Sequence, residues 1–186
     1  LDPEVALAQQ RIGIALVYEG HYADGLRALQ QVPSDFNPPL WHYQVAWALL
    51  YLGRDSEAQT LIDQYLRNQP KDRGGIVTAA RAILDARRGD TRRAEADIAA
   101  AITKGTGFQH FHHAAYSIAM ADALLRRPEA AVRFLREAAD EGLPCYPCFA
   151  NDPFLANLRG DSGYVSLMRE LGSQWSERRV ALLHHP

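Results

Sequence analysis

The chain has 186 residues, of which 47% are apolar and 23% are charged, and its formal net charge is −2. This composition predicts a folded protein with a substantial core and argues against disorder. The small net charge gives no general attraction to nucleic acid or to an anionic membrane, and no run of about 18 apolar residues predicts a membrane span. We therefore expect a cytoplasmic protein, and two cysteines are too few to predict a disulfide framework.

Four stretches of the chain align on the positions Gly20, Gly53, Gly89 and Arg126, which lie 33, 36 and 37 residues apart. This spacing is typical of a helix pair with its turns, so it predicts four successive helix pairs. The three glycines predict a positive φ at the end of each first helix. Arg126 predicts a fourth turn of a different shape, with Pro128 opening the next helix.

The residues around these four positions share a pattern of size. A small side chain stands seven residues before and five residues after each position, and a large aliphatic one stands nine residues after it. Small side chains allow two helix axes to cross closely, and the large ones fill the next layer of the core. The residues are Gly13, Ala46, Ala82 and Ala119; Gly25, Ala58, Ala94 and Ala131; and Leu29, Ile62, Ile98 and Leu135.

This pattern resembles the tetratricopeptide repeat (TPR), most fully in the second unit with Ala46, Gly53, Ala58 and Pro70. The resemblance implies an all-α fold, a right-handed α-α superhelix whose helix pairs occupy residues 1–141. A Sel1-like helical repeat of similar length would imply the same fold class. Pro3 lies close to two periods before Pro70, so we expect the chain to begin in the tail of an earlier repeat of a longer protein. Alternatively, Asp2 and Pro3 simply cap the first helix.

Residues 142–178 depart from the repeat and predict a C-terminal cap. Asp152 and Pro153 predict the start of a short helix, and a last helix follows. An apolar stripe on that helix is suited to cover the apolar end of the last repeat. The segment resembles the closing stretch after such repeats in bacterial serine/threonine kinases and transcriptional regulators. We expect residues 179–186 to form a frayed tail. The stripe consists of Tyr164, Met168, Leu171 and Trp175.

The first helices of the pairs, as the resemblance implies, line the inner curve of the superhelix and form a peptide-binding groove. Tyr43, Trp47 and Tyr51 are spaced by four residues and so face the same way. Exposed aromatic side chains favour capture of an apolar or aromatic peptide. The alternative is that these side chains pack within the chain or are covered by its own terminus. The predicted groove residues are Ile14, Tyr18, Tyr43, Trp47, Tyr51, Ile83, Arg87, Tyr116 and Met120.

The resemblance implies a non-catalytic protein-binding or peptide-binding module, the regulatory or scaffolding part of a larger bacterial signalling or transcription protein. The sequence contains no phosphate-binding loop and no hydrolase motif, and we expect no catalytic residue and no cofactor. The arginines near the third and fourth turns are interleaved with acidic residues, which predicts a solvated edge or an ion-pair network and not a nucleic-acid site. These arginines are Arg87, Arg88, Arg92, Arg93, Arg126, Arg127, Arg133 and Arg136.

Two alternatives from other functional classes stay open. Cys145 and Cys148 with His110 and His113 have the ligand types of a Cys₂His₂ zinc shell, and a Cys-x-x-Cys pair can also carry thiol chemistry. The more conservative interpretation is that both cysteines fill a hydrophobic seam. The other alternative is self-association to a homo-oligomer through an uncapped N-terminal face of the solenoid.

Overall fold

The computed structural model describes residues 2–183. Within this range the chain forms ten α-helices and one short 3₁₀ helix, and no strand. The helices are α1 (Pro3–Tyr18), α2 (Tyr22–Gln30), α3 (Pro38–Tyr51), α4 (Asp55–Asn68), α5 (Ile76–Arg87), α6 (Thr91–Gly105), α7 (Phe111–Leu124), α8 (Pro128–Asp140), α9 (Tyr146–Asn151), η1 (Pro153–Leu158) and α10 (Ser162–Leu183).

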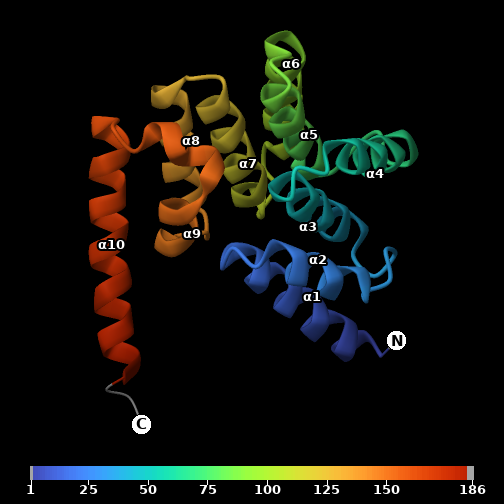
Figure 1. The fold of residues 1–186 in the computed structure, drawn as a ribbon, viewed down its shortest axis with the longest axis horizontal. Coiled ribbons are helices and arrows are strands. Elements are labelled where there is room, and N and C mark those ends of the chain that lie inside the picture. Colours follow the sequence, from blue (N-terminus) through green and yellow to red (C-terminus); the bar gives the residue numbers. More distant parts are fainter. Residues whose placement is uncertain (1, 184–186) are drawn as a thin grey trace.

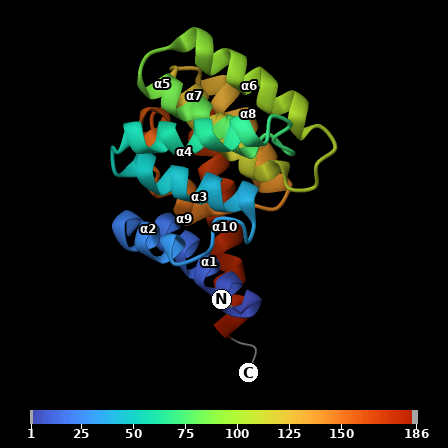
Figure 2. The ribbon, with the colours of Figure 1, turned by 90° about the vertical axis from the view of Figure 1, so that its right-hand side faces the viewer.

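The first eight helices form four consecutive antiparallel hairpins, which stack from α1–α2 to α7–α8 (Figures 1 and 2). The predicted all-α, TPR-like solenoid is therefore confirmed. Its core runs along the stack and is built mainly from α3, α5 and α7, since more than half of α3 and nearly the whole of α5 and of α7 are buried.

The turns inside the four pairs share one backbone geometry. Gly20, Gly53 and Gly89 have φ values of 86°, 71° and 76°, as predicted. Arg126 has a φ of 59°, so the prediction of a differently shaped fourth turn is wrong. Its N–H donates to the Ala123 carbonyl at 2.9 Å, just as the glycines donate to the carbonyl three residues earlier. The chain thus accepts a side chain in the left-handed region, which costs about 1–2 kcal/mol, to keep the hairpin geometry constant.

Close helix crossing explains the small residues in the first pair. A Cβ atom on Gly13 would lie 2.7 Å from Cγ of Leu29, and one on Gly25 would lie 2.8 Å from the Gly13 carbonyl oxygen. Both distances are shorter than non-bonded carbon contacts allow. Glycine at these positions therefore lets α1 and α2 approach more closely than any other residue would.

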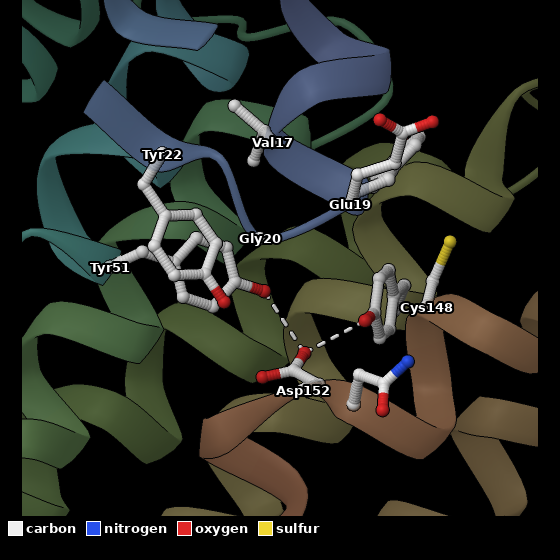
Figure 3. A pocket seen from close by; sticks show the side chains of 10 residues that line it. Val17, Glu19, Gly20, Tyr22, Tyr51, Cys148 and Asp152 are labelled. Carbon is white, nitrogen blue, oxygen red and sulfur yellow. Dashed lines mark hydrogen bonds between the residues drawn. The ribbon is translucent and has the colours of Figure 1, made fainter. Parts of the chain in front are cut away.

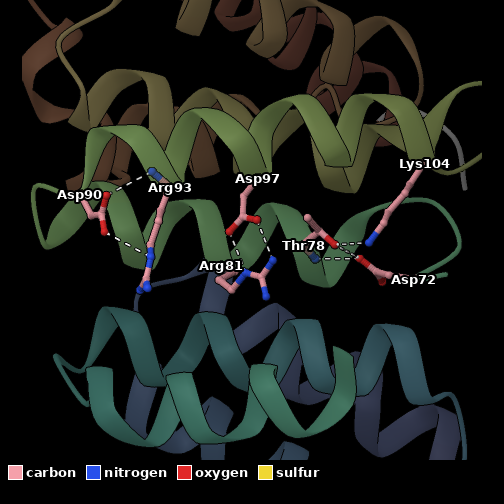
Figure 4. Close-up of polar contacts among 7 residues, drawn as sticks. All are labelled: Asp72, Thr78, Arg81, Asp90, Arg93, Asp97 and Lys104. Atoms are coloured by element: carbon pink, nitrogen blue, oxygen red, sulfur yellow. Dashed lines mark hydrogen bonds and ion pairs between the residues drawn. The ribbon is translucent and has the colours of Figure 1, made fainter. Parts of the chain in front are cut away.

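Polar side chains join α5 to α6 within the third pair (Figure 4). Arg81 donates two hydrogen bonds to the Asp97 carboxylate, both at 2.7 Å, and the Lys104 ammonium donates to the Thr78 hydroxyl at 3.0 Å. Ion pairs such as Arg93–Asp90, at 3.5 Å, occupy the edge where the sequence interleaves arginines with acids. The edge therefore carries separate ion pairs that share no residue with one another, among them Arg87–Asp55 and Arg127–Glu95.

The cap consists of α9, η1 and α10, which follow the fourth pair. Asp152 accepts a hydrogen bond from the Phe154 N–H at 2.8 Å, so it begins η1 as predicted. In α10, Tyr164, Leu167 and Leu171 are buried against α8 and α9. Tyr164 donates from its hydroxyl to the Phe149 carbonyl at 2.8 Å, which fixes α10 to α9.

The far half of α10 departs from the prediction in two ways. Trp175, which we expected in the apolar stripe, is 39% exposed because this part of the helix projects beyond α8 and α9 (Figure 1). The helix also continues to Leu183, so residues 179–183 are helical and the expectation of a frayed tail from residue 179 is wrong for them. Residues 184–186 lie outside the described range.

No helix between residues 2 and 183 combines the length and the apolar character that crossing a membrane requires.

Candidate functional site

The aromatic stripe of α3 faces the inner curve, but it is not an open surface. Tyr43 and Trp47 are fully buried, and Tyr51 is half-buried. Trp47 donates from Nε1 to the Ser117 hydroxyl at 3.1 Å, and Tyr43 donates from its hydroxyl to the His113 carbonyl at 3.2 Å. Side chains of α3 therefore reach α7, although the two helices belong to different pairs.

Five of the nine predicted groove residues are buried by this curvature, so their expected exposure is wrong. The other four, Ile14, Tyr18, Tyr51 and Arg87, are half-buried and lie at the margin of the core. The structure thus brings the nine residues to the inner side but leaves only these four with exposed area. The five buried residues are Tyr43, Trp47, Ile83, Tyr116 and Met120.

The part of the inner face that Tyr51 and Tyr116 form is covered by residues 145–158, which comprise α9 and η1 and which we call the closing segment. The ring of Phe154 stacks on Tyr51 with centroids 4.7 Å apart and an interplanar angle of 9°. Tyr22 stacks on Tyr51 at 4.5 Å, and the Arg87 guanidinium lies 5.2 Å from the Phe154 ring centroid. In this half of the face the chain's own closing segment therefore lies on Tyr51 and Tyr116.

Asp152 fixes the closing segment to the repeats through two tyrosines. Its Oδ2 accepts hydrogen bonds from the Tyr51 hydroxyl at 3.0 Å and from the Tyr116 hydroxyl at 2.7 Å (Figure 3). Burial raises the pKa of Asp152 to about 6, although the hydrogen bonds from the tyrosines and from Phe154 N–H act in the opposite direction. Burial, together with the nearby Asp152 carboxyl, also holds the pKa of both tyrosines well above its ordinary value.

We call these hydrogen bonds of Asp152 with Tyr51 and Tyr116 the latch. The sequence did not predict it. The Asp-Pro pair identifies Asp152 as a helix cap, and nothing in its spacing to Tyr51 or Tyr116 predicts the contact. The only available signal is that tyrosines on one face of successive first helices need a hydrogen-bond partner once they are buried.

A cavity of about 90 Å³ lies where the closing segment meets the turn between α1 and α2 (Figure 3). Tyr22 and Glu19 line it on one side, and Cys148 and Asp152 line it on the other. We call it the Asp152 cavity. It is large enough for water.

Cys145 and Cys148 form a disulfide with each other. The zinc alternative needs both sulfurs as thiolates, so its shell with His110 and His113 is not formed. Among the residues that the structure describes, no three His, Cys, Asp or Glu side chains are placed to hold a metal. The ring closed by this disulfide spans only four residues, which limits its stabilisation through the unfolded chain to about 2 kcal/mol.

The other half of the inner face contains an open cavity of about 410 Å³ at the N-terminal ends of α3, α5 and α7. We call it the Phe108 cavity. Its volume is within the range of about 300–1,000 Å³ that is usual for ligand pockets. Pro39 and Leu40, which line the cavity, lie on α3 one turn before Tyr43, the first residue of the aromatic stripe. Its lining residues are Asn37, Pro39, Leu40, Arg73, Ile76, Phe108, His110 and His113.

Four of the eight side chains that line the Phe108 cavity are apolar, and the other four, Asn37, Arg73, His110 and His113, carry polar groups. Leu40 and Phe108 are half-buried and present apolar surface, and the Arg73 guanidinium lies 5.9 Å from the Phe108 ring centroid. Burial lowers the pKa of His113 to about 3, and neighbouring His112 and His110 add to this effect. At neutral pH His113 is therefore an uncharged imidazole, which can donate one hydrogen bond and accept another.

No protein-family model matches the chain, and no curated protein matches its sequence. Among solved structures, the chain is similar to "MamA RS-1 ArsTM double mutant", with a TM-score of 0.46 and 18% sequence identity over 95% of this chain and 98% of that one.

Proposed function

We propose that the chain is a non-catalytic module that binds a protein or peptide segment, as the regulatory or scaffolding part of a larger bacterial signalling or transcription protein. The observation that carries the proposal is the division of the inner face. One half holds the closing segment of the chain itself, and the other half is the open Phe108 cavity.

The ligand chemistry follows from both halves. The closing segment, which is helical, occupies its half with the ring of Phe154 stacked on Tyr51. The Phe108 cavity offers apolar contact from Leu40 and Phe108, an uncharged His113, and one cation at its rim, Arg73. An apolar or aromatic side chain of the partner therefore fits the cavity, and burying it supplies most of the affinity.

The nine predicted groove residues have two different parts in this proposal. The five buried members belong to the packed core of the inner face, and none of them lines the Phe108 cavity. Tyr18 and Ile14 extend the accessible margin at the N-terminal repeat. Direct contacts with the ligand centre on Leu40 and Phe108.

The test is a selection of binders from a library of random peptides displayed on phage, followed by titration of fluorescein-labelled peptides with anisotropy detection. We expect enriched peptides with an aromatic or large aliphatic residue, and at least ten-fold weaker binding by Leu40→Asp and by Phe108→Ala. Trp175→Ala is the matched control, because Trp175 is an exposed aromatic residue outside the inner face. Far-UV circular dichroism verifies that each variant folds. Equal affinities of all three variants and the wild type would refute the cavity as the binding site.

Self-association through α1 is a second candidate function. The different exposure of equivalent residues on α1 and α3 supports it. Ile12 on α1 is 53% exposed, whereas Val45, in the same place on α3 and 33 residues later, is 3% exposed because α2 packs against α3. A second copy of the chain placing its own α1 on this face would bury Ile12 and Val5. Light scattering over a range of concentrations tests this. A dimer that Ile12→Arg converts to a monomer supports it, and a monomeric wild type at all concentrations excludes it.

A further inference from the structure

The disulfide between Cys145 and Cys148 has no part in the proposed peptide site, because it lies beside the Asp152 cavity and not beside the Phe108 cavity. It is also not what holds the closing segment in place. Phe149 and Leu155 are fully buried, and Asp152 binds two tyrosines of the repeats. These contacts do not involve the sulfur atoms, so the segment can keep its position when the bond is broken.

The two sulfurs differ in accessibility. Cys145 stands immediately before α9 and is half-buried, whereas Cys148 lies inside the first turn of α9 and is 6% exposed. Thiol–disulfide exchange requires a thiolate to approach one sulfur in line with the bond, so access decides which sulfur is attacked. An incoming thiolate can reach Cys145, and the bulk of α9 shields Cys148.

We propose that Cys145 and Cys148 form a thiol–disulfide exchange site that accepts two electrons from a dithiol. A thiolate of the dithiol attacks Sγ of Cys145, the bond between the two cysteines breaks, and its electron pair leaves on Sγ of Cys148. The second thiol of the dithiol then attacks the dithiol's own sulfur in the mixed disulfide and releases Cys145. The dithiol is oxidised to a disulfide, and the chain gains two electrons and two protons.

Cys148 lines the Asp152 cavity together with Glu19 and Asp152. The Asp152 cavity has room for water, which would supply the proton to the departing sulfur. Cys145, at the more accessible position, then remains as the sulfur that exchanges with partners.

The experiment uses the full chain. The wild type is reduced with dithiothreitol, freed from it, and alkylated with iodoacetamide, and the two sites are followed by peptide mass spectrometry. Separately, Cys148→Ser and Cys145→Ser are incubated with oxidised glutathione, and the mixed disulfide is followed by intact mass. Far-UV circular dichroism and thermal unfolding compare oxidised and reduced wild type.

We expect Cys145 to be alkylated at least ten-fold faster than Cys148 in the reduced wild type. Cys148→Ser should form the glutathione adduct at least ten-fold faster than Cys145→Ser, and denaturant should remove the difference. The fold should survive reduction with a shift of only a few degrees in the unfolding midpoint. Equal alkylation rates, or unfolding on reduction, would overturn the proposal, and the wild-type measurement decides even where a serine variant does not fold.

Discussion

Asp152→Asn removes the charge of the buried latch while keeping its size and an oxygen that can accept hydrogen bonds. In the folded chain the pKa of Asp152 is raised from its ordinary value of 3.8 to about 6, because burial disfavours the carboxylate. The asparagine does not titrate. Comparing the two proteins at several pH values therefore isolates the contribution of this one group, since all other groups are the same in both.

The sign follows from proton binding in the two states. Below pH 3.8 the carboxyl is protonated whether the chain is folded or unfolded. Between pH 3.8 and about 6 the unfolded chain releases the proton and the folded chain keeps it, so the free energy of unfolding falls as the pH rises through this window. Above pH 6 the contribution is constant. A pKa raised from 3.8 to about 6 corresponds to roughly 3 kcal/mol.

Urea unfolding followed by circular dichroism at about pH 3.5, 5, 6 and 7 measures the effect. We expect the free energy of unfolding of the wild type, minus that of Asp152→Asn, to fall by about 3 kcal/mol between the lowest and the highest pH. Asp35→Asn, which changes an exposed aspartate, is the control variant. A difference for Asp152→Asn that stays constant or rises with pH would refute the reasoning that the latch carboxyl is destabilised by burial.

Three further predictions concern stability. Trp47→Ala should lower the free energy of unfolding by about 3–5 kcal/mol, because Trp47 is 1% exposed at the centre of the core. Trp175→Ala should change it by no more than about 0.5 kcal/mol, and similar losses for both tryptophans would contradict the described burial. His113→Gln should reduce the loss of stability that the wild type undergoes as the pH falls from about 6.5 towards 3, because burial lowers the pKa of folded His113 to about 3; an unchanged pH profile in urea unfolding would argue against a buried neutral imidazole. Gly13→Ala should destabilise the chain by about 1–3 kcal/mol through overpacking, whereas Gly160→Ala, with no atom within 4 Å of the added Cβ, should be nearly neutral in the same assay; equal effects would show that the helix crossing adapts.

The repeat architecture was predictable because its causes are local in the sequence. Gly20, Gly53 and Gly89 adopt the positive φ that ends a helix, and Gly13 stands where two helices cross at a distance that allows no side chain. Each of these requirements acts within one hairpin of about 35 residues. The pattern of small and large side chains therefore predicts the hairpins and their order.

The curvature of the stack was not predictable in the same way. Whether Trp47 faces a groove or a neighbouring helix depends on small rotations that accumulate over two repeats, and Trp47 meets Ser117, 70 residues away. Solvent-facing and core-facing aromatic residues have the same spacing in the sequence. The prediction of an exposed groove consequently failed at Trp47, although the helix face was assigned correctly.

Arg126 and the cysteines show two other limits. Arg126 suggested a new turn, but the helix pairs on either side impose the same geometry and the arginine tolerates the left-handed region. Cys145 and Cys148 suggested packing or metal binding, and the disulfide depends on how the short α9 begins, which the proline-rich stretch does not specify. In both cases the surrounding structure overrides the local preference.

The latch between Asp152 and Tyr51 joins residues 101 positions apart, and it has a consequence for how the chain unfolds. In an open array of repeats each unit touches only its neighbours, so the end unit can melt first and the others follow one at a time. Here the closing segment, which follows the fourth helix pair, is hydrogen-bonded to Tyr51 of the second pair, so units distant in the sequence are in direct contact. Loss of the cap then weakens the middle of the array as well as its end, and the whole chain should gain the all-or-none behaviour of a compact domain.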